Sequence, residues 1–294
     1  MLLAQLLKLL SYLPLRALHA LGAVVGWLAQ WLPTRSRRNV WENIPRCFPE
    51  LSARQQRSMV RATLIETAKS FLETAALWNW PGPRLLGLIR EVTGREVLTQ
   101  ALAQGRGVII VMPHLGSWEL AASYCSSLQP MTTLYKPPAS AALEAMMLAG
   151  RQRFGARLVP TDTRGLRAMY QALAHGETVG ILPDQNPRPG TGIHVPFFGQ
   201  QTYTMTLVGR LIQKSGAEII YAYAERLPRG AGFHVYLRAA GGASEGLDLE
   251  GVTALVNADI ESCVRQCPTQ YQWTYRRFKF TPEELAKHQV FVDD

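Results

Sequence analysis

His114 and Glu119 are the two residues of this sequence whose types and spacing most clearly allow chemistry. His114 follows the apolar, β-branched run 108–112, which is typical of a strand buried on both faces of a parallel sheet. Ligands of open α/β sheets bind at the carboxyl ends of the strands, where we therefore expect His114. If Ser117 caps a helix that begins at Trp118, Glu119 falls in its first turn and can reach back to the imidazole.

Together the two side chains indicate a base and its orienting acid. A carboxylate that is hydrogen-bonded to one ring nitrogen fixes the histidine tautomer and leaves the other nitrogen free to accept a proton. His114 is therefore our candidate general base, and Glu119 is expected to orient it and to stabilise the imidazolium. The alternative is a strand-end histidine whose neighbouring carboxylate serves only the structure. Backbone amides at 115–117 are candidate donors to an oxyanion.

The pair opens an ordered series of sequence blocks. After His-x4-Glu come Tyr-Lys-Pro at 135–137, an arginine-rich segment at 151–160, Gly-Ile-Leu-Pro-Asp-Gln at 180–185, Val-Pro-Phe-Phe-Gly at 195–199 and an aromatic, basic block at 273–279. In this order the blocks resemble the lipid A late acyltransferases, the bacterial lauroyl and myristoyl transferases of the lysophospholipid acyltransferase superfamily, over essentially the whole chain. The sequence departs from that pattern at Asn186-Pro187, where many relatives carry a second acidic residue and glycine.

The resemblance implies an enzyme that moves a fatty acyl chain from an acyl carrier protein thioester to a hydroxyl of a lipid A precursor in lipopolysaccharide biosynthesis. We expect no cofactor. The apolar amino terminus and the basic cluster that follows it predict an enzyme at the bacterial inner membrane, with the catalytic domain on the cytoplasmic face. Direct attack by a deprotonated hydroxyl needs no covalent enzyme intermediate. Other interpretations stay open: another lysolipid or glycolipid acceptor, a (thio)esterase using the same His-Glu pair, or a catalytically silent membrane-binding protein.

Further residues are expected to bind substrate. Asp184 and Gln185 follow a second buried-strand pattern at 179–182, so they should reach the same sheet edge as His114. The resemblance implies that Asp184 contacts the acceptor or basic groups of the site, although a simple turn carboxylate is the alternative. Cationic side chains suit a phosphorylated acceptor, although each is also a candidate solvated surface charge. The cationic candidates are Lys136, Arg151 and Arg153.

Two aromatic segments each allow two interpretations. The stretch 183–199 is expected to be a long loop, in which Phe197 and Phe198 line an acyl pocket or anchor the loop in the core. The block 273–279 either meets lipid headgroups or forms a packed terminal strand.

Composition bounds the partners of the chain. Its 294 residues carry a formal charge of +9, which suits an anionic partner, and 47% of them are hydrophobic. Nucleic acid is disfavoured because the sequence lacks a concentrated basic helix and a stacking motif. The four cysteines stand at irregular spacings, so we expect reduced thiols and no metal site, and Cys125 is expected in the core.

The first 33 residues are expected to form a membrane-associated helix, followed by a catalytic domain over 34–294. The apolar stretch 17–32 would extend about 24 Å as a helix against about 30 Å of hydrocarbon, so an interfacial helix and a tilted anchor are both open. A merely buried helix is the alternative. A basic cluster that anionic headgroups would attract follows directly, and no cleavable signal peptide is expected. The cluster comprises Arg35, Arg37, Arg38 and Arg46.

The remaining pattern predicts an α/β fold with a largely parallel central sheet flanked by helices. Ser52 and Gln55 have capping-box spacing at the start of a helix over 51–80, and short helices are expected between 83 and 104. Strands and helices then alternate, which is typical of a parallel sheet covered on both faces. The expected strands are 108–112, 131–135, 157–160, 178–182, 218–224 and 233–237, and the expected helices are 141–154, 165–175, 205–215 and 252–267.

Overall fold

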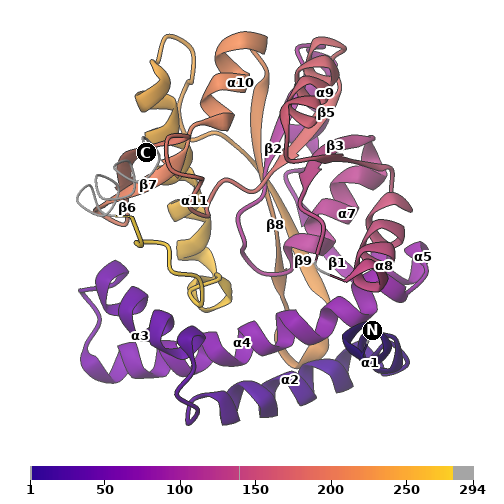
Figure 1. Cartoon of the computed structure of the whole chain (residues 1–294), viewed down its shortest axis with the longest axis vertical. Helices are drawn as coiled ribbons and strands as arrows, with labels where there is room; N and C mark the ends of the chain where they lie inside the picture. Colours follow the sequence, from indigo (N-terminus) through magenta and orange to yellow (C-terminus); the bar gives the residue numbers. More distant parts are fainter. Residues whose placement is uncertain (1, 139, 281–294) are drawn as a thin grey trace, which may run out of the picture.

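A seven-stranded sheet of order β1-β9-β8-β2-β5-β3-β4 runs through the computed structural model, which describes residues 2–138 and 140–280 (Figure 1). Neighbouring strands are parallel except for β8 and β9, which are antiparallel. The strands are β1 (Ile89–Thr93), β2 (Val108–Val111), β3 (Met131–Tyr135), β4 (Ala156–Pro160), β5 (Thr178–Ile181), β8 (Glu218–Arg226) and β9 (Phe233–Ala239). The predicted fold class, a mostly parallel sheet flanked by helices, is confirmed.

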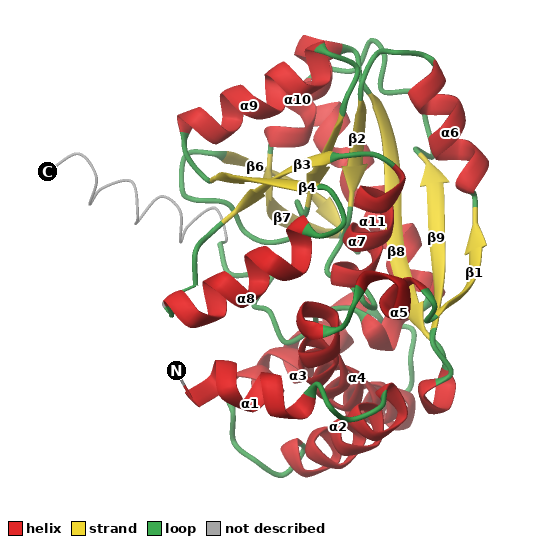
Figure 2. Cartoon of the chain, turned by 90° about the vertical axis from the view of Figure 1, so that its right-hand side faces the viewer, coloured by secondary structure: helices red, strands yellow, loops and turns green. Residues whose placement is uncertain are grey.

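Helices cover both faces of this sheet (Figure 2). The amino-terminal helices are α1 (Leu2–Leu10), α2 (Leu15–Ala29), α3 (Arg35–Cys47) and α4 (Ala53–Asn79). The later ones are α5 (Gly82–Leu86), α6 (Arg95–Ala103), α7 (Trp118–Leu128), α8 (Ala141–Gln152), α9 (Thr163–Ala174), α10 (Leu207–Ser215) and α11 (Leu249–Gln266), with short 3-10 turns at Pro228–Gly230 and Pro268–Gln270.

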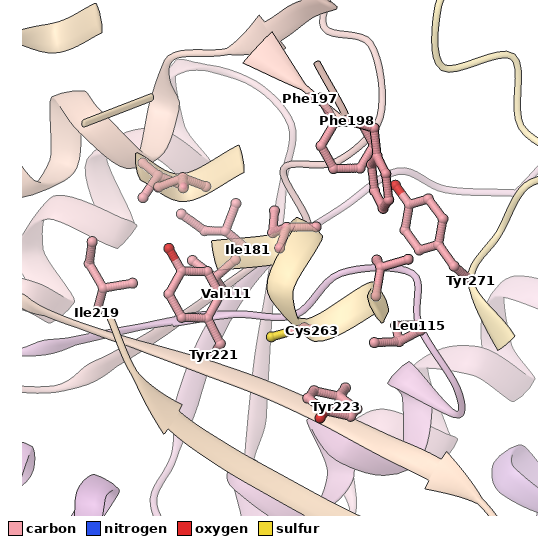
Figure 3. Close-up of a cluster of buried hydrophobic side chains, with 14 of the residues drawn as sticks. Val111, Leu115, Ile181, Phe197, Phe198, Ile219, Tyr221, Tyr223, Cys263 and Tyr271 are labelled. Atoms are coloured by element: carbon pink, nitrogen blue, oxygen red, sulfur yellow. The ribbon is translucent and has the colours of Figure 1, made fainter. Parts of the chain in front are cut away.

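Strand β2, which precedes His114, is buried on both faces at the centre of the sheet. All four of its side chains are fully buried and alternate between two hydrophobic clusters. Ile109 and Val111 join α9, α10 and α11 on one face, whereas Val108 and Ile110 join α5, α6 and α7 on the other. Figure 3 shows the first cluster, in which Val111 lies among aromatic and aliphatic side chains of β5, β8 and α11.

The amino-terminal helices form a platform below the sheet. Helix α4 begins with the predicted capping box, in which Ser52 and Gln55 bond reciprocally, and α2 lies along it (Figure 1). The two helices approach closely because Gly22 and Gly26 have no side chain. A Cβ on Gly22 would lie 2.7 Å from Lys69 Cα, and one on Gly26 would lie 2.4 Å from Ile65 Cα. The contact therefore requires glycine at both positions.

The outer sides of α1 and α2 remain apolar and exposed. Among residues 2–138 and 140–280, no helix combines the length and the hydropathy needed to cross a bilayer. Exposed large apolar side chains on and between these helices are Leu2, Leu3, Leu6, Leu9, Tyr12, Leu13, Leu21, Val24, Val25, Trp27, Leu28, Trp31 and Leu32.

Three local expectations differ from the structure. The region 83–104 contains the edge strand β1 as well as two helices, because Ile89–Thr93 pairs with β9 although its side chains are mostly exposed. The stretch 183–199, expected to be a long loop, contains the strand β6 (Gly192–Phe197), which forms a hairpin with β7 (Gln200–Met205). Phe198 and Gly199, with φ of 50° and 69°, form the tight turn that joins them. The block 273–279 is packed but contains no strand.

Candidate active site

His114 and Asp184 meet because β2 and β5 are parallel and in register. Val111 pairs with Ile181, so the residues three positions beyond each strand lie side by side. Asp184 Oδ1 lies 2.8 Å from His114 Nδ1, and the backbone N–H of His114 donates to Asp184 Oδ2 at 2.8 Å. The side chain of Asp184 is only 2% exposed, whereas that of His114 is 14% exposed. The expected placement of both residues at one sheet edge is confirmed.

The charge state of Asp184 fixes the histidine tautomer. Burial raises the pKa of this carboxyl, but the charge of His114 and its hydrogen bonds lower it more, and the resulting pKa lies below the ordinary value. An ionised carboxylate only accepts hydrogen bonds, so Nδ1 of His114 donates to it. The Nε2 atom is then the basic nitrogen of the ring.

No hydrogen bond joins Glu119 to His114 among the residues that the structure describes, so the contact expected from the sequence is not observed. Glu119 does lie in the first turn of α7, where Ser117 is the N-cap residue without a side-chain cap bond. Its carboxylate accepts from Arg151 Nε at 3.0 Å, from a terminal nitrogen of the same guanidinium, and from Trp78 Nε1 at 3.4 Å. Burial raises the pKa of Glu119, but Arg151 and Trp78 lower it more, so it stays ionised as part of this pair.

The loop that carries His114 is held by the backbone of the 270–272 segment and of β8. The amide of Gly116 donates to Gln270 O at 3.0 Å, that of Ser117 to Ala224 O at 2.8 Å, and that of Leu115 to Pro113 O at 2.6 Å. The amide of Gln272 in turn donates to His114 O at 3.0 Å. The three amides at 115–117 are therefore occupied by carbonyls, and the expectation that they stabilise an oxyanion is wrong.

A buried ion pair fixes the other side of this loop. Arg226, at the end of β8, donates to Gly116 O at 2.9 Å and to Glu73 of α4 at 2.7 and 2.8 Å. Glu73 also lies 3.1 Å from His19 of α2. Arg226 and Glu73 were not among the sequence candidates, because an isolated arginine and an isolated glutamate carry no spacing signal that distinguishes them from surface charges.

Arg277 has a comparable role behind Asp184. It is 2% exposed and donates to Tyr203 O at 2.6 Å and Thr204 Oγ1 at 2.8 Å of β7, and to Asn186 Oδ1 at 3.2 Å. Its charge also lowers the pKa of Asp184. The block 273–279 thus serves packing, and the unusual Asn186 is accommodated by a direct bond to it.

Two cavities meet at His114. The first, of about 340 Å³, lies between α1, α4 and α8 and is lined by apolar residues such as Leu7, Phe71 and Leu143. The second, of about 410 Å³, extends between α7, α8, β3 and β4. Residues that line both cavities are His114, Trp118, Glu119, Lys136 and Met147.

The other predicted binding residues divide between the site and the scaffold. Gln185 Nε2 lies 3.3 Å from His114 Nε2 and donates to Gln272 Oε1 at 2.8 Å. Lys136 is exposed and lines both cavities. Arg151 lines the second cavity but is paired with Glu119. Arg153 donates to Gly150 O at 3.0 Å and to the carbonyls of Leu77 and Trp80, so the structure uses it to cap α4.

Other side chains proposed from the sequence lie away from these cavities. Phe197 and Phe198 are buried against Tyr271 and Trp273, which supports the anchoring interpretation over an acyl pocket. Cys125 is 1% exposed, and burial raises the pKa of its thiol to about 12, as expected for a core cysteine and not for a nucleophile.

Comparison with known proteins assigns this chain to a family. The family profile described as Bacterial lipid A biosynthesis acyltransferase matches residues 1–280. The chain belongs to the bacterial lipid A biosynthesis acyltransferases. It is 31% identical to the lipid A biosynthesis lauroyltransferase of Escherichia coli (strain K12) over 278 residues, which are 94% of this chain and 90% of that protein.

Two further acyltransferases of the family from the same organism are more distant. The palmitoleoyltransferase is 29% identical over 92% of this chain and 87% of its own length, and the myristoyltransferase is 24% identical over 87% and 79%. The acyltransferase assignment made from the ordered sequence blocks is therefore confirmed, and the lipid A pathway is the one in which the chain acts.

Proposed function

We propose that this acyltransferase moves a fatty acyl chain from an acyl carrier protein thioester to a hydroxyl of a lipid A precursor, with His114 as general base and Asp184 as its orienting carboxylate. The observation that carries this proposal is the His114–Asp184 pair at the junction of two cavities. The proposal assigns the orienting role to Asp184 instead of Glu119 and retains His114 as the base. Glu119 keeps a place at the junction, where it fixes Arg151.

The chemical step follows from the tautomer. His114 Nε2 takes the proton of the acceptor hydroxyl as its oxygen bonds to the thioester carbonyl carbon. Asp184 stabilises the imidazolium through Nδ1–H. Collapse of the intermediate breaks the carbon–sulfur bond, and the imidazolium returns its proton to the leaving thiolate. The histidine is thus regenerated, and no cofactor enters the balance.

The negative charge that develops on the carbonyl oxygen needs a donor other than the amides at 115–117. Gln185 and Lys136 have suitable donors, because the Gln185 amide lies beside Nε2 and Lys136 lines both cavities. We assign this stabilisation to them. Lys136 is also positioned for a phosphate of the acceptor.

The two cavities suit two hydrocarbon-bearing substrates. The first is bounded by Leu3 and Leu7 of α1, next to the exposed apolar side of that helix, and we assign it to the lipid acceptor. We assign the second, which extends inside the fold beneath α7 and α8, to the transferred chain. Both assignments place the acceptor hydroxyl and the thioester at His114.

We further propose that the enzyme works on the cytoplasmic face of the bacterial inner membrane, with α1 and α2 lying in the interface. Support comes from the many exposed apolar side chains on and next to these helices. The formal charge of +9 favours both an anionic lipid surface and an acidic carrier protein.

The decisive test replaces His114 by Ala. Purified variant and wild type are given lauroyl-acyl carrier protein and a lipid A precursor, and the acylated product is measured by mass spectrometry. We expect transfer to fall by about 10³-fold or more, because a positioned base contributes about 10²–10⁴-fold. Unchanged transfer would exclude His114 as the base, and thioester loss without acylated product in wild type would identify a thioesterase.

A further inference from the structure

A second cationic site lies at the opposite end of the helical platform from His114. A cavity of about 510 Å³ is formed between the end of α2, α3 and the start of α4. Only Arg37 among its cations belongs to the basic cluster noted in the sequence; the other three come from α4. The cavity is lined by Gln30, Trp31, Arg37, Trp41, Arg54, Arg57, Ser58, Val60 and Arg61.

Three arginines gather positive charge on one side of α4. Arg54, Arg57 and Arg61 are spaced three and four residues apart, so they share one face of the helix, where like charges repel. All three are exposed, and none forms an ion pair within residues 2–138 and 140–280. An anion placed between them would relieve this repulsion.

The fourth arginine is fixed toward the same cavity. Arg37 Nε donates to Gln30 O at 2.7 Å, at the end of α2, and this bond joins α3 to α2. A guanidinium that is held by one nitrogen keeps its terminal N–H groups for other acceptors, and this planar fork matches phosphate oxygens. The cavity therefore has the donors of a phosphate site.

The apolar surroundings identify which phosphate compound fits. Trp31 is 71% exposed and Trp41 is 37% exposed, and the exposed side chains Val24, Val25 and Leu28 of α2 lead directly to them. Tryptophan beside arginine at the edge of an apolar face is typical of the headgroup layer of a membrane. A soluble phosphate compound would have no use for the exposed apolar surface.

We infer that this cavity binds the phosphate headgroup of an anionic phospholipid while α2 lies in the interface. The inference rests on the proposed membrane surface but not on the proposed catalytic step. Helix α4 has 27 residues, about 40 Å of length, with the arginines near its start and the His114 cavity contacts Ser70, Thr74 and Trp78 near its end. A bound headgroup at one end therefore sets the orientation in which the His114 cavity faces the lipid.

The test compares a triple variant with a matched control of equal charge. Arg54→Gln, Arg57→Gln and Arg61→Gln are combined in one protein, and Arg95→Gln, Arg167→Gln and Arg210→Gln in another. The control arginines are exposed on α6, α9 and α10, away from the platform (Figure 2). Binding is measured by co-sedimentation with vesicles of phosphatidylcholine alone and of phosphatidylcholine mixed with phosphatidylglycerol.

We expect the site variant to lose about 100-fold in binding to the phosphatidylglycerol vesicles, while the control loses about tenfold at most. Binding to phosphatidylcholine vesicles and acyl transfer in detergent should match wild type in both variants. Equal losses in the two variants would show a general charge effect and overturn the site. The site would also be overturned if the wild type bound vesicles with and without phosphatidylglycerol equally well.

Two further measurements separate the occupants and the hypotheses. Phosphatidylglycerol vesicles should change the tryptophan fluorescence of the wild type, Trp31→Phe should abolish this change, and inorganic phosphate should not produce it. The same change with phosphate alone would identify a soluble anion and contradict the lipid assignment. Failure of the His114→Ala test with a preserved phosphatidylglycerol preference would remove the catalytic proposal and leave this site intact.

Discussion

At the scale of single residues, the carboxylate that bonds to His114 is the one that lies next to it in the sheet and not the one near it in the chain. Asp184 stands seventy positions from His114 and contacts both its ring and its backbone amide. Glu119 stands five positions away and is neutralised by Arg151. A carboxylate already bound to a guanidinium has less charge to offer an imidazolium, so the two acids should respond differently to substitution.

We expect Asp184→Asn to reduce kcat by about 10³-fold or more, because an amide neither fixes the same tautomer nor stabilises an imidazolium. Glu119→Gln is the matched control at the same junction, and it should act mainly by releasing Arg151. Steady-state kinetics with acyl carrier protein thioester will separate them. A larger loss of kcat for Glu119→Gln than for Asp184→Asn would restore Glu119 as the orienting acid.

At the scale of elements, the site depends on a buried ion pair between α4 and β8. Arg226 joins Glu73 of the platform to the carbonyl of Gly116 in the histidine loop. Gly116 itself has φ of 59°, and a Cβ there would lie 2.1 Å from Ala224 O, so β8 also holds this loop by close backbone contact. The amino-terminal helices are thus part of the framework that holds the His114 loop.

We expect Glu73→Gln to lower the free energy of unfolding by about 3–5 kcal/mol at pH 7, since it leaves the buried Arg226 with only the partly buried Glu66, 3.3 Å away, as a counter-ion. Burial raises the pKa of Glu73, but Arg226 lowers it more, to about 2 from an ordinary 4.5. The stabilisation is therefore complete above pH 4.5 and is lost as pH falls toward about 2.

Denaturant unfolding at several pH values tests this linkage. The difference between wild type and Glu73→Gln should shrink across that acidic range, because a protonated glutamate resembles glutamine in charge. Glu42→Gln, at an exposed position of α3, is the control and should change stability by no more than about 0.5 kcal/mol. A difference that stays constant with pH would contradict the ion-pair explanation.

At the scale of the whole molecule, the exposed apolar surface and the cationic cavity belong to one platform. The His114 cavity is lined by residues of α1, and the cavity with the arginines is lined by the end of α2 and the start of α4. In Figure 1, α2 lies along α4, so one pair of helices connects the two cavities. The proposed reaction needs a site that both a lipid acceptor and a protein-bound donor can reach. The platform provides such a site if α1 and α2 lie in the interface.

We expect the combined changes Val24→Glu and Leu28→Glu to weaken binding to phosphatidylcholine vesicles by about 100-fold, because two apolar side chains would no longer enter the interface. Gln171→Glu with Gln213→Glu adds the same charge at exposed positions of α9 and α10 and should leave binding unchanged. Retained vesicle binding by the α2 variant would mean that this face does not meet lipid.

The sequence by itself determined the fold class, the strands of the sheet centre and the position of His114 at their carboxyl edge. Buried parallel strands are continuous apolar runs, and the residue after such a run is fixed at the edge by connectivity alone. The sequence also determined the family, because each of the ordered blocks is a short continuous segment that can be recognised without knowing the fold.

Only the tertiary structure decided which acid is hydrogen-bonded to His114, that the amides at 115–117 are occupied, and that Arg226 and Arg277 hold the surrounding segments. Each of these depends on strand register or on contacts between distant segments. The sequence did not predict β1 because its side chains are mostly exposed, so that pairing with β9 defines the strand. It did not predict the β6–β7 hairpin because a left-handed turn at Phe198-Gly199 joins the two strands.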